Sequence, residues 1–331
     1  MNIFVSPRLA LVLSLVFATQ FSLRAHADGN PPLLVPGTTI EITGAKGHFD
    51  FLKLDLVNKH LVACHTKDGT VDVIDLATDK VLARIPTGAA QDAAVDAKAG
   101  KYFATISDLK HVAVIDSTTL KVTNTVPTEG ELDAILLDPK DRRVYATHDH
   151  GNEVWVVDAD TEKLVATVAI PGSPEVMAYD PVKDRVYLNI VPTNETVVID
   201  PKTETVVDHW SNLPAQKPHG LVLDADTGRL FSAGANGQMA VIDTGTGKVI
   251  ATVKIADRVD EVAFDPGLRR VYCAANGVLS VVQETPDGAV SLGDVTTAKG
   301  GKNVAVDPQT HAVWTMTTDG TNSYAKSWVL P

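Results

Sequence analysis

The sequence contains no short motif that would identify an enzyme or a cofactor site. It has no P-loop, no GxSxG, no HExxH and no CxxC, so no activity can be assigned from a motif. Only two cysteines occur among its 331 residues. After the first 18 residues, no apolar stretch is long enough to cross a bilayer as a helix. Function must therefore be argued from repeats, charge and the placement of polar residues.

Positive charge is also scarce. The chain has 29 lysines and arginines against 41 aspartates and glutamates, which gives a net charge of −12 at pH 7. So acidic a chain is poorly matched to nucleic acid or to an anionic membrane surface, and we expect neither as a partner. It favours a cation or a basic partner, although the same charge also keeps a protein soluble.

Residues 1–27 have the features of a secretory signal peptide. Arg8 precedes an apolar run over residues 9–18, and Ala25-His26-Ala27 supplies a small-x-small cleavage pattern before Asp28. The run is short for a membrane span, which favours cleavage over a permanent anchor. We therefore expect a periplasmic or secreted protein without membrane insertion. Loss of the two arginines in the signal would take the net charge from −12 to −14.

One unit of about 42 residues repeats along the rest of the chain. It is clearest at residues 133–170, where four short apolar runs rich in β-branched and aromatic residues alternate with turns. An aspartate closes the first run of every unit, at Asp55, Asp96, Asp138, Asp180, Asp224, Asp265 and Asp307. Seven units with four strand signals each predict an all-β fold, a seven-bladed β-propeller of four-stranded blades.

The second and third strands of the units carry further repeated signals. Arg143-Val144-Tyr145 recurs as Arg185-Val186-Tyr187 and Arg270-Val271-Tyr272, and third strands end like Val73-Ile74-Asp75. With these features the chain resembles the YVTN-type, YncE-like seven-bladed propellers of bacterial envelopes over residues 38–331. The eponymous tetrapeptide is degenerate, as in Tyr145-Ala146-Thr147-His148. The resemblance implies the fold, and it favours a binding protein over an enzyme.

The N-terminus is expected to complete the last blade. Residues 39–44 match the fourth strand of a unit, whereas the final unit shows only three strand signals. Pairing the two would close the ring and hide two strand edges, and we expect a monomer. The predicted domains are therefore the signal at 1–27, an extended Pro-rich segment at 28–37 and one propeller at 38–331.

The two cysteines are not expected to form a disulfide. Cys64 and Cys273 fall on the second strands of the first and sixth units, with the seventh unit between them. That places them well beyond the roughly 7 Å between Cα atoms that a disulfide allows. We interpret both as buried free thiols.

A ring of polar residues is the main candidate site. The first strand of each blade lines the central channel, and counting five residues back from each closing aspartate reaches the channel mouth on one face, here called the top face. The seven positions are all polar in otherwise apolar strands, and we predict that they bind a ligand: Asp50, Gln91, Asp133, Glu175, His219, Asp260 and Lys302. Lys302 lies between Asp260 and Asp50 and is expected to neutralise both. A register slip would substitute Asp92 for Gln91 and Glu261 for Asp260.

Two groups of residues could hold a metal ion. Asp133, Glu175 and His219 come from three consecutive blades and have the ligand types of a divalent metal site, although polar residues are also expected at a wet channel mouth. His148 and His150 form a His-x-His pair on a top-face loop, which could chelate a metal or be a solvated turn.

Three functions follow from this site. The first is an exported binding protein whose channel mouth takes a small molecule, a metal ion or an envelope protein. The second is a metal-dependent, lactonase-like hydrolase with a divalent cation at the mouth and Asp50 or Asp260 as the base. The third is a metal-binding or metal-delivery protein that uses the same residues.

Overall fold

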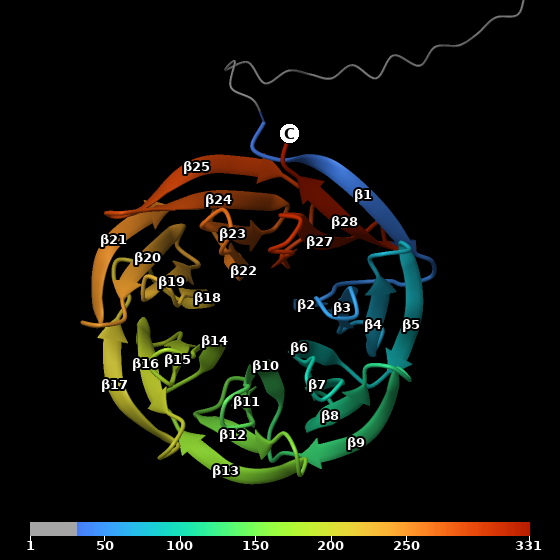
Figure 1. Ribbon diagram of the computed structural model, residues 1–331, viewed down its shortest axis with the longest axis horizontal. Coiled ribbons are helices and arrows are strands. Elements are labelled where there is room, and N and C mark those ends of the chain that lie inside the picture. Colours follow the sequence, from blue (N-terminus) through green and yellow to red (C-terminus); the bar gives the residue numbers. More distant parts are fainter. Residues whose placement is uncertain (1–31) are drawn as a thin grey trace, which may run out of the picture. The chain divides into compact units, whose positions relative to one another are not determined.

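The structure is a computed structural model that describes residues 32–331, so the predicted signal peptide lies outside the described residues. The described chain contains 28 strands and no helix. The strands form seven four-stranded antiparallel sheets around one axis, with first strands innermost and fourth strands outermost (Figure 1). The predicted seven-bladed propeller is therefore confirmed. Within residues 32–331 no helix is long and apolar enough to cross a membrane.

Six blades are continuous in sequence. Blade 1 contains β2 (Leu52–Asp55), β3 (His60–His65), β4 (Thr70–Asp75) and β5 (Lys80–Pro86). Blade 2 contains β6 (Ala90–Asp96), β7 (Lys101–Ile106), β8 (His111–Asp116) and β9 (Lys121–Pro127). Blade 3 contains β10 (Leu132–Asp138), β11 (Arg143–His148), β12 (Glu153–Asp158) and β13 (Lys163–Ala169).

The next three blades follow the same order. Blade 4 contains β14 (Pro174–Asp180), β15 (Arg185–Ile190), β16 (Glu195–Asp200) and β17 (Thr205–Ser211). Blade 5 contains β18 (Pro218–Asp224), β19 (Arg229–Gly234), β20 (Gln238–Asp243) and β21 (Lys248–Lys254). Blade 6 contains β22 (Val259–Asp265), β23 (Arg270–Ala275), β24 (Val278–Thr285) and β25 (Gly288–Thr296).

The seventh blade joins the two ends of the described chain, as predicted. It contains β26 (Ala305–Val306), β27 (Val313–Thr318), β28 (Ser323–Val329) and, on the outside, β1 (Val35–Ile42), which pairs antiparallel with β28. β1 begins three residues before the predicted domain start at residue 38. The N-terminal strand thereby covers an edge that would otherwise expose unpaired backbone groups.

The core lies between the blades. Second and third strands are almost wholly buried, as in the β7 run from Tyr102 to Ile106. Six of the seven second strands carry a buried aromatic side chain, and Tyr145 of blade 3 packs with Met177 and Leu188 of blade 4. Cys64 and Cys273 are free and buried on β3 and β23, which confirms the prediction for both thiols.

The closing aspartates lie on the opposite, bottom face and hold turns and blades together. In Asp180 one carboxylate oxygen accepts the backbone N–H groups of Val182 and Lys183, both at 2.9 Å. This side-chain cap is the reason that aspartate recurs at the position. In other blades the second oxygen reaches the next blade, as in the 2.6 Å ion pair from Asp96 to Arg142.

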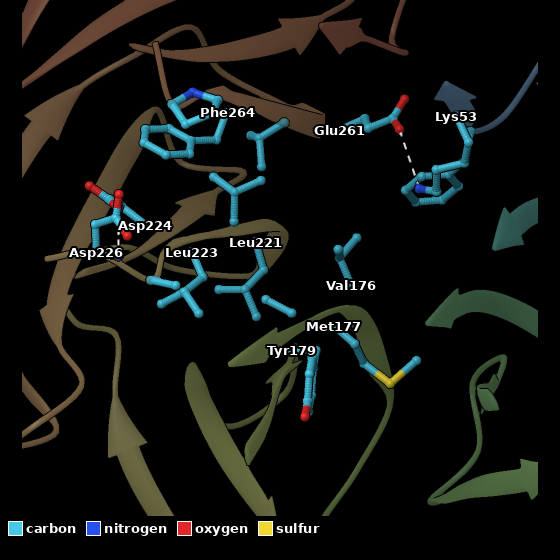
Figure 2. Close-up of a pocket in the computed structure, with 16 residues that line it drawn as sticks. Lys53, Val176, Met177, Tyr179, Leu221, Leu223, Asp224, Asp226, Glu261 and Phe264 are labelled. Carbon is cyan, nitrogen blue, oxygen red and sulfur yellow. Dashed lines mark hydrogen bonds and ion pairs between the residues drawn. The ribbon is translucent and has the colours of Figure 1, made fainter. Parts of the chain in front are cut away.

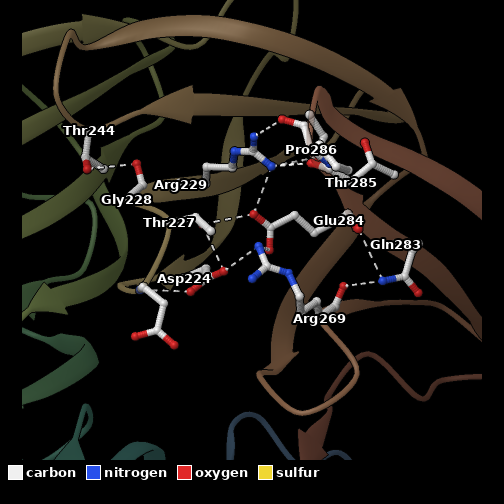
Figure 3. A network of polar contacts seen from close by, with 12 residues as sticks. Asp224, Thr227, Gly228, Arg229, Thr244, Arg269, Gln283, Glu284, Thr285 and Pro286 are labelled. Carbon is white, nitrogen blue, oxygen red and sulfur yellow. Dashed lines mark hydrogen bonds and ion pairs between the residues drawn. The ribbon is translucent and has the colours of Figure 1, made fainter.

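The junction of blades 5 and 6 extends this pattern into a network (Figure 3). The Arg269 guanidinium lies 3.2 Å from Asp224 and 2.9 Å from the buried Glu284 carboxylate. Arg229 approaches the other Glu284 oxygen at 3.0 Å. Two guanidinium groups thus compensate the buried Glu284 and the neighbouring Asp224, as buried charges require.

Candidate functional site

Bulges at the start of the first strands shape the channel mouth. In blades 2 to 6 the pairing of the first and second strands shifts register near the top face, as between Ala90 and Ala93 in β6. A bulge leaves a residue unpaired and redirects its side chain. Five of the seven predicted ring residues lie within these irregular segments: Gln91, Asp133, Glu175, His219 and Asp260.

The ring contains one amine, and it is shared by two acids. Lys302 Nζ lies 2.7 Å from Asp50 Oδ1 and 2.6 Å from Asp260 Oδ2, as the order around the ring predicts. Gln91 accepts a hydrogen bond from Thr66 Oγ1 at 3.3 Å. This side of the mouth is therefore internally compensated.

The other side of the mouth is not compensated. His219 Nδ1 donates to the Lys217 carbonyl at 2.8 Å, and the other ring nitrogen, Nε2, faces Glu175 Oε1, 3.6 Å away. Two acceptors face each other there unless a proton or a cation lies between them. Within residues 32–331 no side chain donates a hydrogen bond to the Asp133 carboxylate or forms an ion pair with it.

Burial and mutual repulsion hold protons on these acids. Burial, reinforced by the charges of Glu175 and Asp50, raises the pKa of Asp133 well above its usual range. Burial and the charge of Asp260 raise the pKa of Glu175 to about 8. Burial also raises the pKa of Asp50, although Lys302 opposes the shift. The mouth thus holds more carboxylates than it can keep ionised without a cation.

A second polar group lies deeper in the channel. Lys53 Nζ is 2.9 Å from Asp92 Oδ1 and 3.9 Å from Glu261 Oε1, and both acids are buried. Backbone N–H groups also donate to them, from Ile135 to Asp92 and from Val304 to Glu261. The two acids considered as register alternatives therefore do not replace ring members, because they form a separate ion group.

One member of this deeper group stands out in the sequence. Lys53 stands two residues before a closing aspartate, where the other first strands carry apolar residues: Ala94, Leu136, Ala178, Val222, Ala263 and Ala305.

A mainly apolar cavity of about 520 Å³ adjoins the ion group, and Lys53 and Glu261 are part of its lining. Figure 2 shows Lys53 and Glu261 on one side of it and Asp224 and Asp226 on the other. The wall between them is mainly hydrophobic and includes Val176, Met177, Leu221, Leu223 and Phe264. Its volume lies in the range of small-molecule sites. At one end Lys53 and Glu261 are already paired with each other, and at the other end Asp226 is exposed to solvent.

The histidines of the top-face loops are placed differently from one another. The His150 side chain is 88% exposed, with Nε2 3.6 Å from Asp149 Oδ1. The His148 ring packs against Trp155 with centroids 4.7 Å apart. A Cβ on Gly130 or on Gly151 would lie 2.2 Å from that ring, so both glycines are needed to admit it. The His-x-His pair gathers no third ligand among the described residues.

One cluster in residues 32–331 brings three candidate metal ligands within 4.8 Å of one another, and it lies on the bottom face: Asp138, Asp141 and Asp184. Sequence reasoning missed it, because Asp138 was interpreted only as a repeated turn residue. The atoms of Asp133, Glu175 and His219 do not converge to this degree, and a metal ion there stays a prediction.

Comparisons with known proteins support the fold alone. No protein-family model matches the chain, and no curated protein matches it in sequence. Among solved structures it is similar to a chain of hydrazine synthase from Kuenenia stuttgartiensis, with a TM-score of 0.75. The match covers 93% of this chain and 99% of that chain at 13% identity. At that identity the similarity extends to the propeller fold and not to a shared activity.

Proposed function

We propose that the protein is an exported binding protein that captures a small, positively charged ligand at the channel mouth. The observation that carries the proposal is the uneven compensation of the ring. Lys302 neutralises Asp50 and Asp260, whereas neither Asp133 nor Glu175 forms an ion pair with a lysine or arginine in the part of the chain that the structure describes. A cation beside Glu175 and His219 Nε2 would replace the proton that otherwise lies between these two atoms.

The raised pKa values make this binding proton-linked. A cation that enters the mouth favours the ionised carboxylates and therefore displaces protons from them. Burial and the charge of Asp260 raise the pKa of Glu175 to about 8, so this group is largely protonated near neutral pH without a ligand. The affinity for a ligand of constant charge should therefore rise with pH, by at most about tenfold per pH unit for each proton displaced.

Export and family form part of the same proposal. The charged, apolar and small-residue pattern of residues 1–27 supports secretion, and the repeat signature supports kinship with the YVTN-type propellers. N-terminal sequencing of protein recovered from the periplasm or the medium tests the export. A first residue of Asp28 is expected, and an intact N-terminus in the cytoplasm would contradict it.

The binding is tested in two steps. Inductively coupled plasma mass spectrometry of the purified protein shows whether a metal ion is retained, with the Asp133→Ala/His219→Ala variant for comparison. Isothermal titration calorimetry with putrescine and with ZnCl₂, at about pH 6 and about pH 8, then distinguishes an organic cation from a metal ion.

Two substitutions locate the site. Glu175→Gln is expected to weaken binding and to remove much of its pH dependence, because it deletes a carboxylate that exchanges a proton for the ligand. Glu41→Gln, on the exposed outer strand β1, should leave both unchanged. Equal affinity in the wild type and Glu175→Gln, or no binding of either probe, would contradict the proposal.

A further inference from the structure

The seven closing aspartates can be compared as seven versions of one site. Each uses one carboxylate oxygen to cap its own turn. In six blades the second oxygen also lies beside a hydrogen-bond donor or a basic side chain. The donors are Tyr102 to Asp55, Arg142 to Asp96, Tyr187 to Asp180, Arg269 to Asp224, His311 to Asp265 and Thr310 to Asp307.

Asp138 is the exception. Its Oδ1 accepts the backbone N–H groups of Lys140 and Asp141 at 2.8 and 3.2 Å. Its Oδ2 is buried and has no hydrogen-bond partner among residues 32–331, and the whole residue is 0% exposed. An unpaired oxygen of a buried carboxylate is costly, so its surroundings call for a donor or a cation.

The next blade presents an acid where other junctions present a base. In six blades the residue before the second strand has a positive φ. Where that residue is Arg142 or Arg269, its side chain reaches the closing aspartate of the previous blade. At the junction of blades 3 and 4 it is Asp184, which is 7% exposed. Asp138, Asp141 and Asp184 each offer an oxygen within 4.8 Å of the others.

A second buried polar atom in this interface also lacks a partner. The Tyr145 hydroxyl has no hydrogen bond, and Tyr145 is 0% exposed. Burial and then the charge of Asp138 raise its pKa, so the hydroxyl lies within the field of that carboxylate. Tyr179 donates to Asp184 Oδ1 at 3.1 Å. An unpaired tyrosine hydroxyl also occurs at Tyr272, so it is the unpaired Asp138 oxygen and the convergent acid set that together indicate a missing ligand.

We propose that a divalent cation of the Ca²⁺ type binds between blades 3 and 4, held by Asp138, Asp141 and Asp184. Calcium takes six to eight oxygen ligands at about 2.3–2.6 Å, so two of its ligand oxygens are at most about 5 Å apart, and the observed spacing fits. Waters complete the shell. The ion supplies to Asp138 the positive charge that Arg142 supplies to Asp96.

Two lysines border the site without occupying it. Lys140 Nζ lies 2.5 Å from Asp184 Oδ2, and Lys202 Nζ lies 3.8 Å from the same oxygen. Their side chains are 51% and 69% exposed, so they approach Asp184 from solvent. Neither forms an ion pair with Asp138 or Asp141. The site retains two carboxylates for the ion, and Lys140 can turn to water when Asp184 ligates it.

The test is calcium titration of the chelator-treated protein by isothermal titration calorimetry. We expect about one Ca²⁺ per chain and at least about a tenfold loss of affinity in Asp138→Asn, which keeps the side-chain shape. Asp141→Asn provides a second variant if the buried change impairs folding, which circular dichroism will show. Terbium luminescence sensitised by Tyr179 gives a local signal, which Tyr179→Phe should diminish while calcium still binds.

Two control variants make the result specific. Asp307→Asn changes a closing aspartate whose second oxygen already has Thr310 as its donor, and it should leave calcium affinity unchanged. Glu175→Gln changes the channel mouth on the other face and should also leave it unchanged. Absence of calcium binding would overturn the proposal, as would binding that Asp138→Asn and Asp141→Asn leave intact or that Glu175→Gln abolishes. The proposed function at the mouth would stand or fall separately.

Discussion

Lys53→Met is expected to destabilise the propeller strongly, and more so at high pH. The substitution keeps an apolar chain of similar length and removes the only amine within residues 32–331 that pairs with Asp92 and Glu261. Removing one partner of a buried ion pair costs about 3–5 kcal/mol, because the remaining charge is left without compensation. The Lys53 side chain is 31% exposed to the channel, so we expect the lower end, about 3 kcal/mol near pH 8.

The pH dependence follows from the proton balance. Burial raises the pKa of Asp92 and of Glu261, and the positive charge of Lys53 limits both shifts. Without Lys53 both pKa values rise further in the folded state, while those of the unfolded chain stay near 4. Between these limits the folded protein binds more protons than the unfolded chain, so stability falls as pH rises. For each unit by which the folded-state pKa of one of these acids rises, the free energy of unfolding at a pH above that pKa falls further, by about 1.4 kcal/mol.

The assay is urea unfolding of the wild type and the variant, followed by tryptophan fluorescence at about pH 5 and about pH 8. Lys163→Met, at an exposed position where β13 begins, is the matched control and should change the free energy of unfolding by less than about 0.5 kcal/mol. Adding Glu261→Gln to Lys53→Met should reduce the pH dependence. A loss below about 1 kcal/mol near pH 8, or an equal loss at both pH values, would refute the reasoning.

Two further predictions concern the channel mouth and the thiols. Burial and the charge of Asp260 raise the folded-state pKa of Glu175 to about 8, so its contribution to stability is present below about pH 4.3 and is lost as pH rises towards 8. In urea unfolding, the free energy of unfolding of Glu175→Gln should therefore depend less on pH than that of the wild type over this window. Parallel pH profiles of the two proteins would contradict this. Burial raises the pKa of both Cys64 and Cys273, so neither thiol should react with a disulfide reagent in the native protein, whereas both should react after denaturation; fast labelling of the native protein would show that the interfaces open.

The architecture could be predicted because it is encoded in local chemistry. The side chain of an aspartate such as Asp180 caps its own turn, so the residue recurs wherever the first strand ends. Counting these turns gives the number of blades, and the missing fourth strand of the last unit shows where residues 39–44 must pair. Neither inference needs a contact between distant units, except at the closure itself.

The candidate site was less accessible to the same reasoning, because bulges change how strand positions map to directions. A regular strand sends Gln91 and Asp92 to opposite faces. The bulge between Ala90 and Ala93 allows Asp92 to approach Lys53 while Gln91 contacts Thr66. Counting back from the closing aspartate therefore found the ring but did not separate it from the deeper ion group.

The acid cluster at the bottom face depends on which residues of neighbouring blades meet, and sequence periodicity does not give this register. Asp184 looks like an ordinary turn residue until it is seen to occupy the place of Arg142 and Arg269.

Comparing the two acidic groups of the channel separates carboxylates that the protein itself compensates from carboxylates that a ligand could compensate. Lys53 and backbone N–H groups compensate Asp92 and Glu261, so that group can be stable without a ligand. Asp133 and Glu175 form no ion pair with a lysine or arginine of the described chain, and burial favours their protonated forms. Protons can be exchanged for a cation at little structural cost, whereas Lys53 cannot leave without exposing two buried carboxylates. The mouth, rather than the deeper ion group, is therefore the part of the channel whose charge a ligand can change.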